Sequence, residues 1–138
     1  MRADLLPEPV SLLLVDDDPV ALRGLERLLS SKGHRIAAST TNGVEAAELV
    51  VELKPQVVIT DLEMPGFDGV ATTSAIRTLG PDIPVIVYSG NGQQDAAQRC
   101  IDAGAVGFVS KMLPLSDLLR AIERAATGKQ VGIILDVE

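Results

Sequence analysis

The stretch that decides the fold reads VVITDLEMPGFDG and runs from Val57 to Gly69. The β-branched run from Val57 to Thr60 predicts a short buried strand, and Met64-Pro65-Gly66 breaks the chain soon afterwards. Asp61 therefore stands at the exposed end of a strand that is otherwise buried. A carboxylate in that position is unfavourable unless another group pairs with it, so the rest of the chain must bring partners to Asp61.

Short apolar runs alternate with amphipathic segments on both sides of this stretch. We expect strands at 10–15, 35–39, 57–60, 84–88 and 105–109. We expect helices at 19–31, between Gly43 and Pro55, at 70–79, at about 93–103, and from Pro114 or Ser116 to Thr127. This alternation predicts an α/β fold, in which a doubly wound five-stranded parallel sheet is joined by five helices through right-handed crossovers. We expect a flavodoxin-like strand order of 2-1-3-4-5.

The length of 138 residues is typical of one domain with a single core. We divide the chain into a lead-in at 1–9, one domain at 10–127 and a C-terminal tail or linker at 128–138. The tail contains a strand-like run, Val131 to Leu135, that has no place in a scheme of five units. It is either a linker to a further domain or an extension that docks or mediates association.

The charge balance restricts the partners of the chain. There are 12 basic and 19 acidic residues, a net charge of −7, which argues against direct binding of nucleic acid or an anionic membrane. No apolar run is long enough to span a bilayer, and the N-terminus does not read as a signal peptide. The single cysteine excludes an intramolecular disulfide and fits a cytoplasmic location.

Polar side chains follow four of the predicted strands. The first strand ends in Asp16 and Asp17, and the later strands deliver Asp61, Ser89 and Lys111. In an open parallel sheet the carboxyl ends of the strands meet at one edge, where ligands bind. Three converging carboxylates repel one another, and a hard divalent cation relieves the repulsion. Oxygen ligands without a histidine and cysteine set favour Mg²⁺ over Zn²⁺ at Asp16, Asp17 and Asp61.

The same set of side chains can accept a phosphoryl group. A carboxylate nucleophile on Asp61, a cation, a lysine and a hydroxyl provide the positioning and charge neutralisation on which phosphoryl transfer depends. Lys111 can contact a group that becomes anionic on Asp61, and Ser89 can donate a hydrogen bond to it.

Four motifs stand in this order at the predicted strand ends. They are Leu14-Val15-Asp16-Asp17-Asp18-Pro19, then Thr60-Asp61-Leu62-Glu63-Met64-Pro65 with Asp68-Gly69, then Val87-Tyr88-Ser89-Gly90, and Gly107-Phe108-Val109-Ser110-Lys111. With these motifs the chain resembles the receiver domain of bacterial two-component response regulators from about Ser11 to Ala126. Met112 stands where many members of that family have proline, and Phe108 stands where tyrosine is more usual.

The resemblance implies specific roles. Asp61 would be phosphorylated by a phosphohistidine of a sensor histidine kinase or phosphotransfer protein, and the main-chain carbonyl of Glu63 would join the magnesium ligands. Ser89 would move toward the phosphoryl group, Phe108 would rotate inward behind it, and Lys111 would bind a phosphoryl oxygen. The partner on the output side would be a downstream effector domain or protein, and a phosphorylation-dependent homodimer of the chain is a further possibility.

Two other functions remain open at this point. A magnesium-dependent phosphohydrolase would also use an aspartyl-phosphate, but it usually needs a second acid soon after the nucleophile, for which Glu63 is the near candidate. An interaction module of the same fold would work without phosphorylation. We expect self-catalysed phosphoryl acceptance and autodephosphorylation only, and no separate enzyme activity. Outside the site, Asp18 is expected to cap a helix and His34 to lie exposed in a loop.

Overall fold

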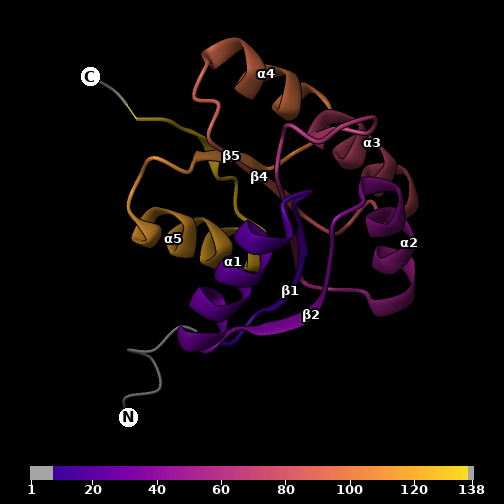
Figure 1. The fold of residues 1–138 in the computed structure, drawn as a ribbon, viewed down its shortest axis with the longest axis vertical. Helices are drawn as coiled ribbons and strands as arrows, with labels where there is room; N and C mark the ends of the chain where they lie inside the picture. The colour runs from indigo at the N-terminus through magenta and orange to yellow at the C-terminus, as the bar shows by residue number, and fades with distance from the viewer. Residues whose placement is uncertain (1–7, 137–138) are drawn as a thin grey trace.

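The computed structural model describes residues 8–136, which form one parallel sheet flanked by helices (Figure 1). Six strands lie within this part of the chain, in the order β2-β1-β3-β4-β5-β6. They are β1 (Ser11–Val15), β2 (Arg35–Thr40), β3 (Val57–Thr60), β4 (Val85–Ser89), β5 (Gly107–Ser110) and β6 (Gly132–Ile134). The predicted α/β fold and the order of the first five strands are confirmed.

Helices cover both faces of the sheet. They are α1 (Pro19–Ser31), α2 (Gly43–Leu53), α3 (Gly69–Leu79), α4 (Gln94–Asp102) and α5 (Leu115–Ala126). The buried residues of α1 and α5 pack in one cluster with alternate strand residues, whereas those of α2, α3 and α4 pack on the opposite face. Figure 1 shows α1 beside α5 on one side, with α2, α3 and α4 on the other. The sheet is therefore doubly wound, as predicted.

Short polar residues position the helix starts on the side of the sheet where the strands end. The Asp18 carboxylate accepts from the Val20 N–H at 3.0 Å, and Pro19 is the first residue of α1. Asn42 caps α2 and Asp68 caps α3 in the same way. The expectation that Asp18 is a cap is confirmed. No helix within residues 8–136 has both the length and the apolar character needed to cross a membrane.

The strand count was predicted one short, because the tail contributes β6. Gly132, Ile133 and Ile134 pair in parallel with Gly107, Phe108 and Val109 of β5. Helix α5 is thus the crossover of a further strand–helix–strand unit rather than the end of the fold. Gly132 has a φ of 83°, a conformation that glycine adopts without strain and that turns the chain into the sheet.

The prediction that His34 lies exposed in a loop was wrong. His34 is 8% exposed, and its Nδ1 accepts a hydrogen bond from the Val10 N–H at 3.1 Å. Gly33, with a φ of 95°, turns the chain at the end of α1 and brings His34 back against the start of β1. Burial lowers the pKa of His34, and the nearby Glu123 carboxylate partly opposes this.

Candidate functional site

Three carboxylates meet where β1 and β3 end. Asp16 follows β1 directly and Asp61 follows β3 directly, and one oxygen from each of Asp16, Asp17 and Asp61 lies within 4.8 Å of the others. The Asp61 N–H donates to the Val15 carbonyl at 2.8 Å, which holds the two strand ends side by side. The convergence predicted from the strand ends is therefore present.

Lys111 reaches into this acidic cluster from the end of β5. Its Nζ donates to Asp16 Oδ2 at 3.1 Å and lies 3.7 Å from Asp61 Oδ1. The Lys111 Nζ lies over the ring of Tyr88, 5.7 Å from the ring centroid. The Lys111 N–H donates to the Ser89 carbonyl at 2.8 Å, so the lysine is anchored at its backbone as well.

The charges of the site are only partly compensated. Burial raises the pKa of Asp61, Lys111 lowers it, and the Asp16 carboxylate raises it again, with a net upward shift. Burial alone would lower the pKa of Lys111, but the Asp61 and Asp16 carboxylates outweigh burial and raise it. Ionised Asp61 is thus less favourable in the folded protein than in the unfolded chain, whereas protonated Lys111 is more favourable.

Gly69 shapes the loop that presents Asp61. A Cβ on Gly69 would lie 2.5 Å from the Asp61 carbonyl oxygen and 2.8 Å from Leu62 Cα, both backbone atoms. The Gly69 N–H donates to the Leu62 carbonyl at 2.6 Å, and the Asp61 Oδ1 accepts from the Leu62 N–H at 2.9 Å. Sequence reasoning assigned Gly69 no role, although an Asp-Gly pair at a helix start after the Asp61 loop was a visible signal.

Ser89 ends β4 and Phe108 lies in β5, the two strands beside β3 on the side of the sheet that ends in β6. Ser89 is 1% exposed, and its Oγ accepts from the Asn91 N–H at 3.0 Å. Phe108 is fully buried in a cluster that includes Leu62, the residue after Asp61. Both residues therefore lie at the strand positions predicted for them, and the Ser89 hydroxyl makes no hydrogen bond to a carboxylate of the site within the part of the chain that the structure describes.

The side chain of Glu63 takes part in a contact between two loops. Its carboxylate accepts from Asn91 Nδ2 at 3.3 Å, which links the loop after β3 to the loop after β4. Glu63 is exposed, and its carboxylate is directed to Asn91. Its predicted main-chain role toward a metal ion stays a prediction.

The donor set of the site suits a hard divalent cation. The three converging ligands are all carboxylates, and they come with no histidine or thiolate. Oxygen ligands of this kind are typical of Mg²⁺ sites, in which water completes the coordination. Burial raises the pKa of Asp61, and Lys111 only partly opposes this shift. A bound cation would add the positive charge that the ionised carboxylate still needs.

Together the fold and the site define a flavodoxin-like α/β domain with an acidic, lysine-paired site at the carboxyl edge of its sheet. The chain belongs to the response regulator receiver domain family, whose sequence model matches residues 12–123. This confirms the resemblance on which the predicted roles were based.

Curated relatives and solved structures agree with this membership. The chain is 34% identical over 116 residues to the DNA-binding transcriptional activator EvgA of Escherichia coli, covering 84% of this chain and 57% of EvgA. It is 30% identical over 125 residues to the nitrate/nitrite response regulator protein NarL of Escherichia coli, covering 90% of this chain and 58% of NarL. A LuxR-family two-component response regulator from Aurantimonas superposes with a TM-score of 0.86 at 28% identity, covering 93% of this chain and 91% of that one. The chain thus spans a little over half the length of the curated relatives.

Proposed function

We propose that this chain is a phosphoacceptor that takes a phosphoryl group onto Asp61 and changes a protein-interaction surface in response. The observation that carries the proposal is the meeting of Asp16, Asp17 and Asp61 within 4.8 Å, with Lys111 Nζ 3.1 Å from Asp16 and 3.7 Å from Asp61. The donor is a phosphohistidine on a sensor histidine kinase or phosphotransfer protein.

In the proposed reaction a carboxylate oxygen of Asp61 attacks phosphorus. A new P–O bond forms, the P–N bond to the donor imidazole breaks, and that nitrogen keeps the electron pair and takes a proton from water. Lys111 contributes positive charge to a phosphoryl oxygen, and Ser89 donates its hydroxyl once it turns from its contact with the Asn91 N–H. Preorganised donors of this kind stabilise the charge that develops on the transferring group.

Mg²⁺ fits the same proposal. Asp16, Asp17, Asp61 and the Glu63 carbonyl would hold it, and when bound it would neutralise charge on the phosphoryl oxygens. Because Lys111 already spans Asp16 and Asp61, the protein's own residues keep the acids close together before the cation arrives.

We propose no separate enzyme activity beyond self-catalysed phosphorylation and autodephosphorylation. A phosphohydrolase would need an acid aimed at the leaving group, whereas the exposed Glu63 carboxylate is engaged by Asn91 at 3.3 Å. Multiple-turnover hydrolysis of phosphate esters would contradict this part of the proposal.

We place the output on the surface formed by α4, β5 and α5, with a downstream effector domain or protein, or a second copy of the chain, as the partner. EvgA is a DNA-binding activator, but the net charge of −7 makes residues 1–138 a poor nucleic-acid surface themselves. We also propose a cytoplasmic location, which suits a chain that receives a phosphoryl group from a kinase inside the cell.

The test is labelling with acetyl phosphate and Mg²⁺, followed by intact mass spectrometry. Wild type is expected to gain the mass of one phosphoryl group, and Asp61→Asn to gain none, because the amide is not a nucleophile. Asp82→Asn is the matched control, since Asp82 is an exposed carboxylate at the amino end of β4. Undiminished labelling of Asp61→Asn would sink the proposal.

A further inference from the structure

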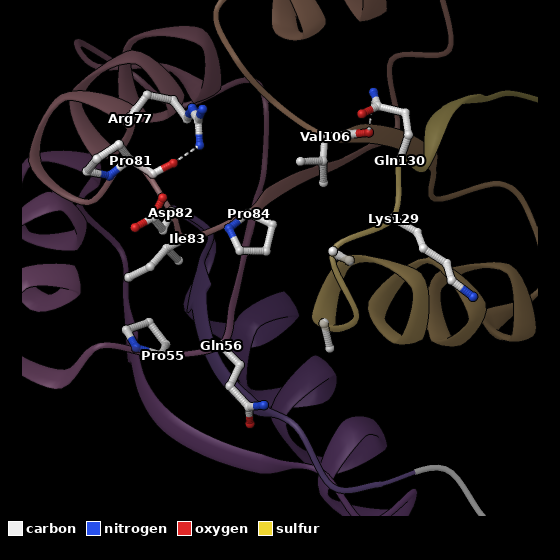
Figure 2. Close-up of a pocket in the computed structure, with 13 residues that line it drawn as sticks. Pro55, Gln56, Arg77, Pro81, Asp82, Ile83, Pro84, Val106, Lys129 and Gln130 are labelled. Atoms are coloured by element: carbon white, nitrogen blue, oxygen red, sulfur yellow. Dashed lines mark hydrogen bonds between the residues drawn. The ribbon is translucent and has the colours of Figure 1, made fainter.

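The tail strand β6 is fitted to the edge of β5. The Val106 carbonyl accepts from the Val131 N–H at 3.1 Å, from the Gly132 N–H at 3.0 Å and from Gln130 Nε2 at 3.1 Å, the last of which is drawn in Figure 2. A Cβ on Gly107 would lie 2.4 Å from Val131 Cγ1, so the glycine leaves the space that Val131 fills. The edge of β5 is therefore shaped to receive this segment.

The side chains of β6 and of its two flanking residues are divided between the two faces of the sheet. Ile133 and Leu135 pack against the cluster that contains Phe108, Leu62 and the buried residues of α4. Val131 and Ile134 pack on the opposite face, against the cluster that contains α5. Since Leu62 directly follows Asp61, one continuous apolar cluster joins the phosphoacceptor loop to one face of the tail.

The docking of β6 is local and small. The strand has 3 residues, and each of them is only partly buried. Elements with few buried apolar contacts open at low free energy, and segments that move during signalling are drawn from such elements. β6 is therefore expected to open without unfolding the rest of the sheet.

We propose that docking of β6 on β5 is coupled to the phosphoryl group on Asp61, and that phosphorylation loosens the tail. This inference rests on the proposed function. In the sheet, β3 and β4 lie on one side of β5 and β6 lies on the other. A phosphoryl group on Asp61 competes with Asp16 for Lys111, whose Nζ now bonds to Asp16 at 3.1 Å and lies 3.7 Å from Asp61, so the residue at the end of β5 changes partner. This change at the end of β5 disturbs the packing of Phe108, whose register partner on β6 is Ile133.

Amide hydrogen exchange on the full chain tests the coupling, with acetyl phosphate and Mg²⁺ added and the phosphoryl content of the same sample measured by mass. We expect exchange at residues 132–134 to become about fivefold faster or more when Asp61 is phosphorylated, which is the lower range of allosteric couplings. Asp61→Asn should show no change. A phosphorylated chain whose tail exchanges at the same rate, or more slowly, overturns the coupling and leaves the proposed function intact. Absence of the phosphoryl group overturns both.

Two neighbouring variants test the route. Ile133→Ala and Ile134→Ala remove similar side chains from one strand, but only Ile133 contacts the Phe108 cluster. The increase in amide exchange rate at residues 132–134 on phosphorylation should fall to about twofold or less in Ile133→Ala. It should persist in Ile134→Ala. Equal responses in the two variants overturn a route through Phe108.

Discussion

The two ends of the parallel strands, the carboxyl edge and the amino edge of the sheet, are surrounded by different kinds of residues. At the carboxyl edge, Asp16, Asp17 and Asp61 crowd within 4.8 Å of one another around Lys111. At the amino edge of β3 to β6, a cavity of about 470 Å³ is lined largely by proline, glutamine and small residues (Figure 2). The exposed charges there, Asp82 and Lys129, take part in no ion pair among the described residues.

This contrast shows where the fold tolerates unfavourable charge. Strand ends and helix starts meet at the carboxyl edge, so side chains from four strands can converge on one ligand. At the amino edge the chain enters each strand through short turns, and polar groups such as Arg77 and Gln130 bond to backbone carbonyls. The same substitution can therefore be made at the site and at a matched position away from it. A difference between the two variants then belongs to the site and not to the fold as a whole.

The largest difference is expected from removing the lysine charge. Lys111→Met should slow phosphorylation by acetyl phosphate about 100-fold, because one preorganised electrostatic donor typically contributes that much. Lys129→Met removes a lysine at the amino edge and should leave the rate unchanged. Equal rates for both variants would show that Lys111 has no part in the transfer.

Replacing Gly69 should affect stability strongly. A methyl group there meets the backbone of Asp61 and Leu62, which cannot move as a flexible side chain can. We expect Gly69→Ala to lower the free energy of unfolding by about 1–3 kcal/mol in urea titrations. Gly24→Ala, in the middle of α1 with nothing within 4 Å of the added Cβ, should raise it by about 0.5–1 kcal/mol. A neutral Gly69→Ala would contradict the close approach.

At the amino edge, His34 makes the stability of the fold depend on pH, and we expect this effect to be smaller than those of the substitutions above. Its folded-state pKa is lowered, so the unfolded chain binds the proton more readily below the unfolded pKa of about 6.5. The stability that depends on neutral His34 is therefore complete above that pH and is lost as the pH falls toward the folded pKa. His34 is the only histidine of the chain, so an NMR titration of its imidazole measures the shift directly. A slope between pH 6.5 and 5 that persists unchanged in His34→Gln would assign it to other groups.

Most of the site could be predicted from the sequence because strand ends are visible in it. Short apolar runs that end at or just before Asp16, Asp61, Ser89 and Lys111 place those residues at one edge once the sheet is parallel. The position of each strand along the chain was enough, and no side-chain geometry was needed.

The missed features depend on contacts between distant segments. The buried His34 accepts a hydrogen bond from the N–H of Val10, 24 residues away, and nothing near His34 in the sequence indicates that contact. Gly69 matters through the backbone of Asp61 and Leu62, and β6 exists because Gly107 leaves room for Val131. A strand-like run of a few residues becomes a strand only where an edge is open to receive it.

The most direct test is a Mg²⁺ titration of thermal or urea unfolding in wild type and Asp61→Asn. The pKa of Asp61 is raised, so stability is lost as the pH rises from the unfolded pKa through the folded one, and the cost is complete above the folded pKa. Asp61→Asn should therefore be more stable than wild type without Mg²⁺. Added Mg²⁺ should stabilise wild type, by about 2.7 kcal/mol at 100 times the dissociation constant, and Asp61→Asn far less. A variant that is less stable without Mg²⁺ and responds to it as wild type does would contradict the account.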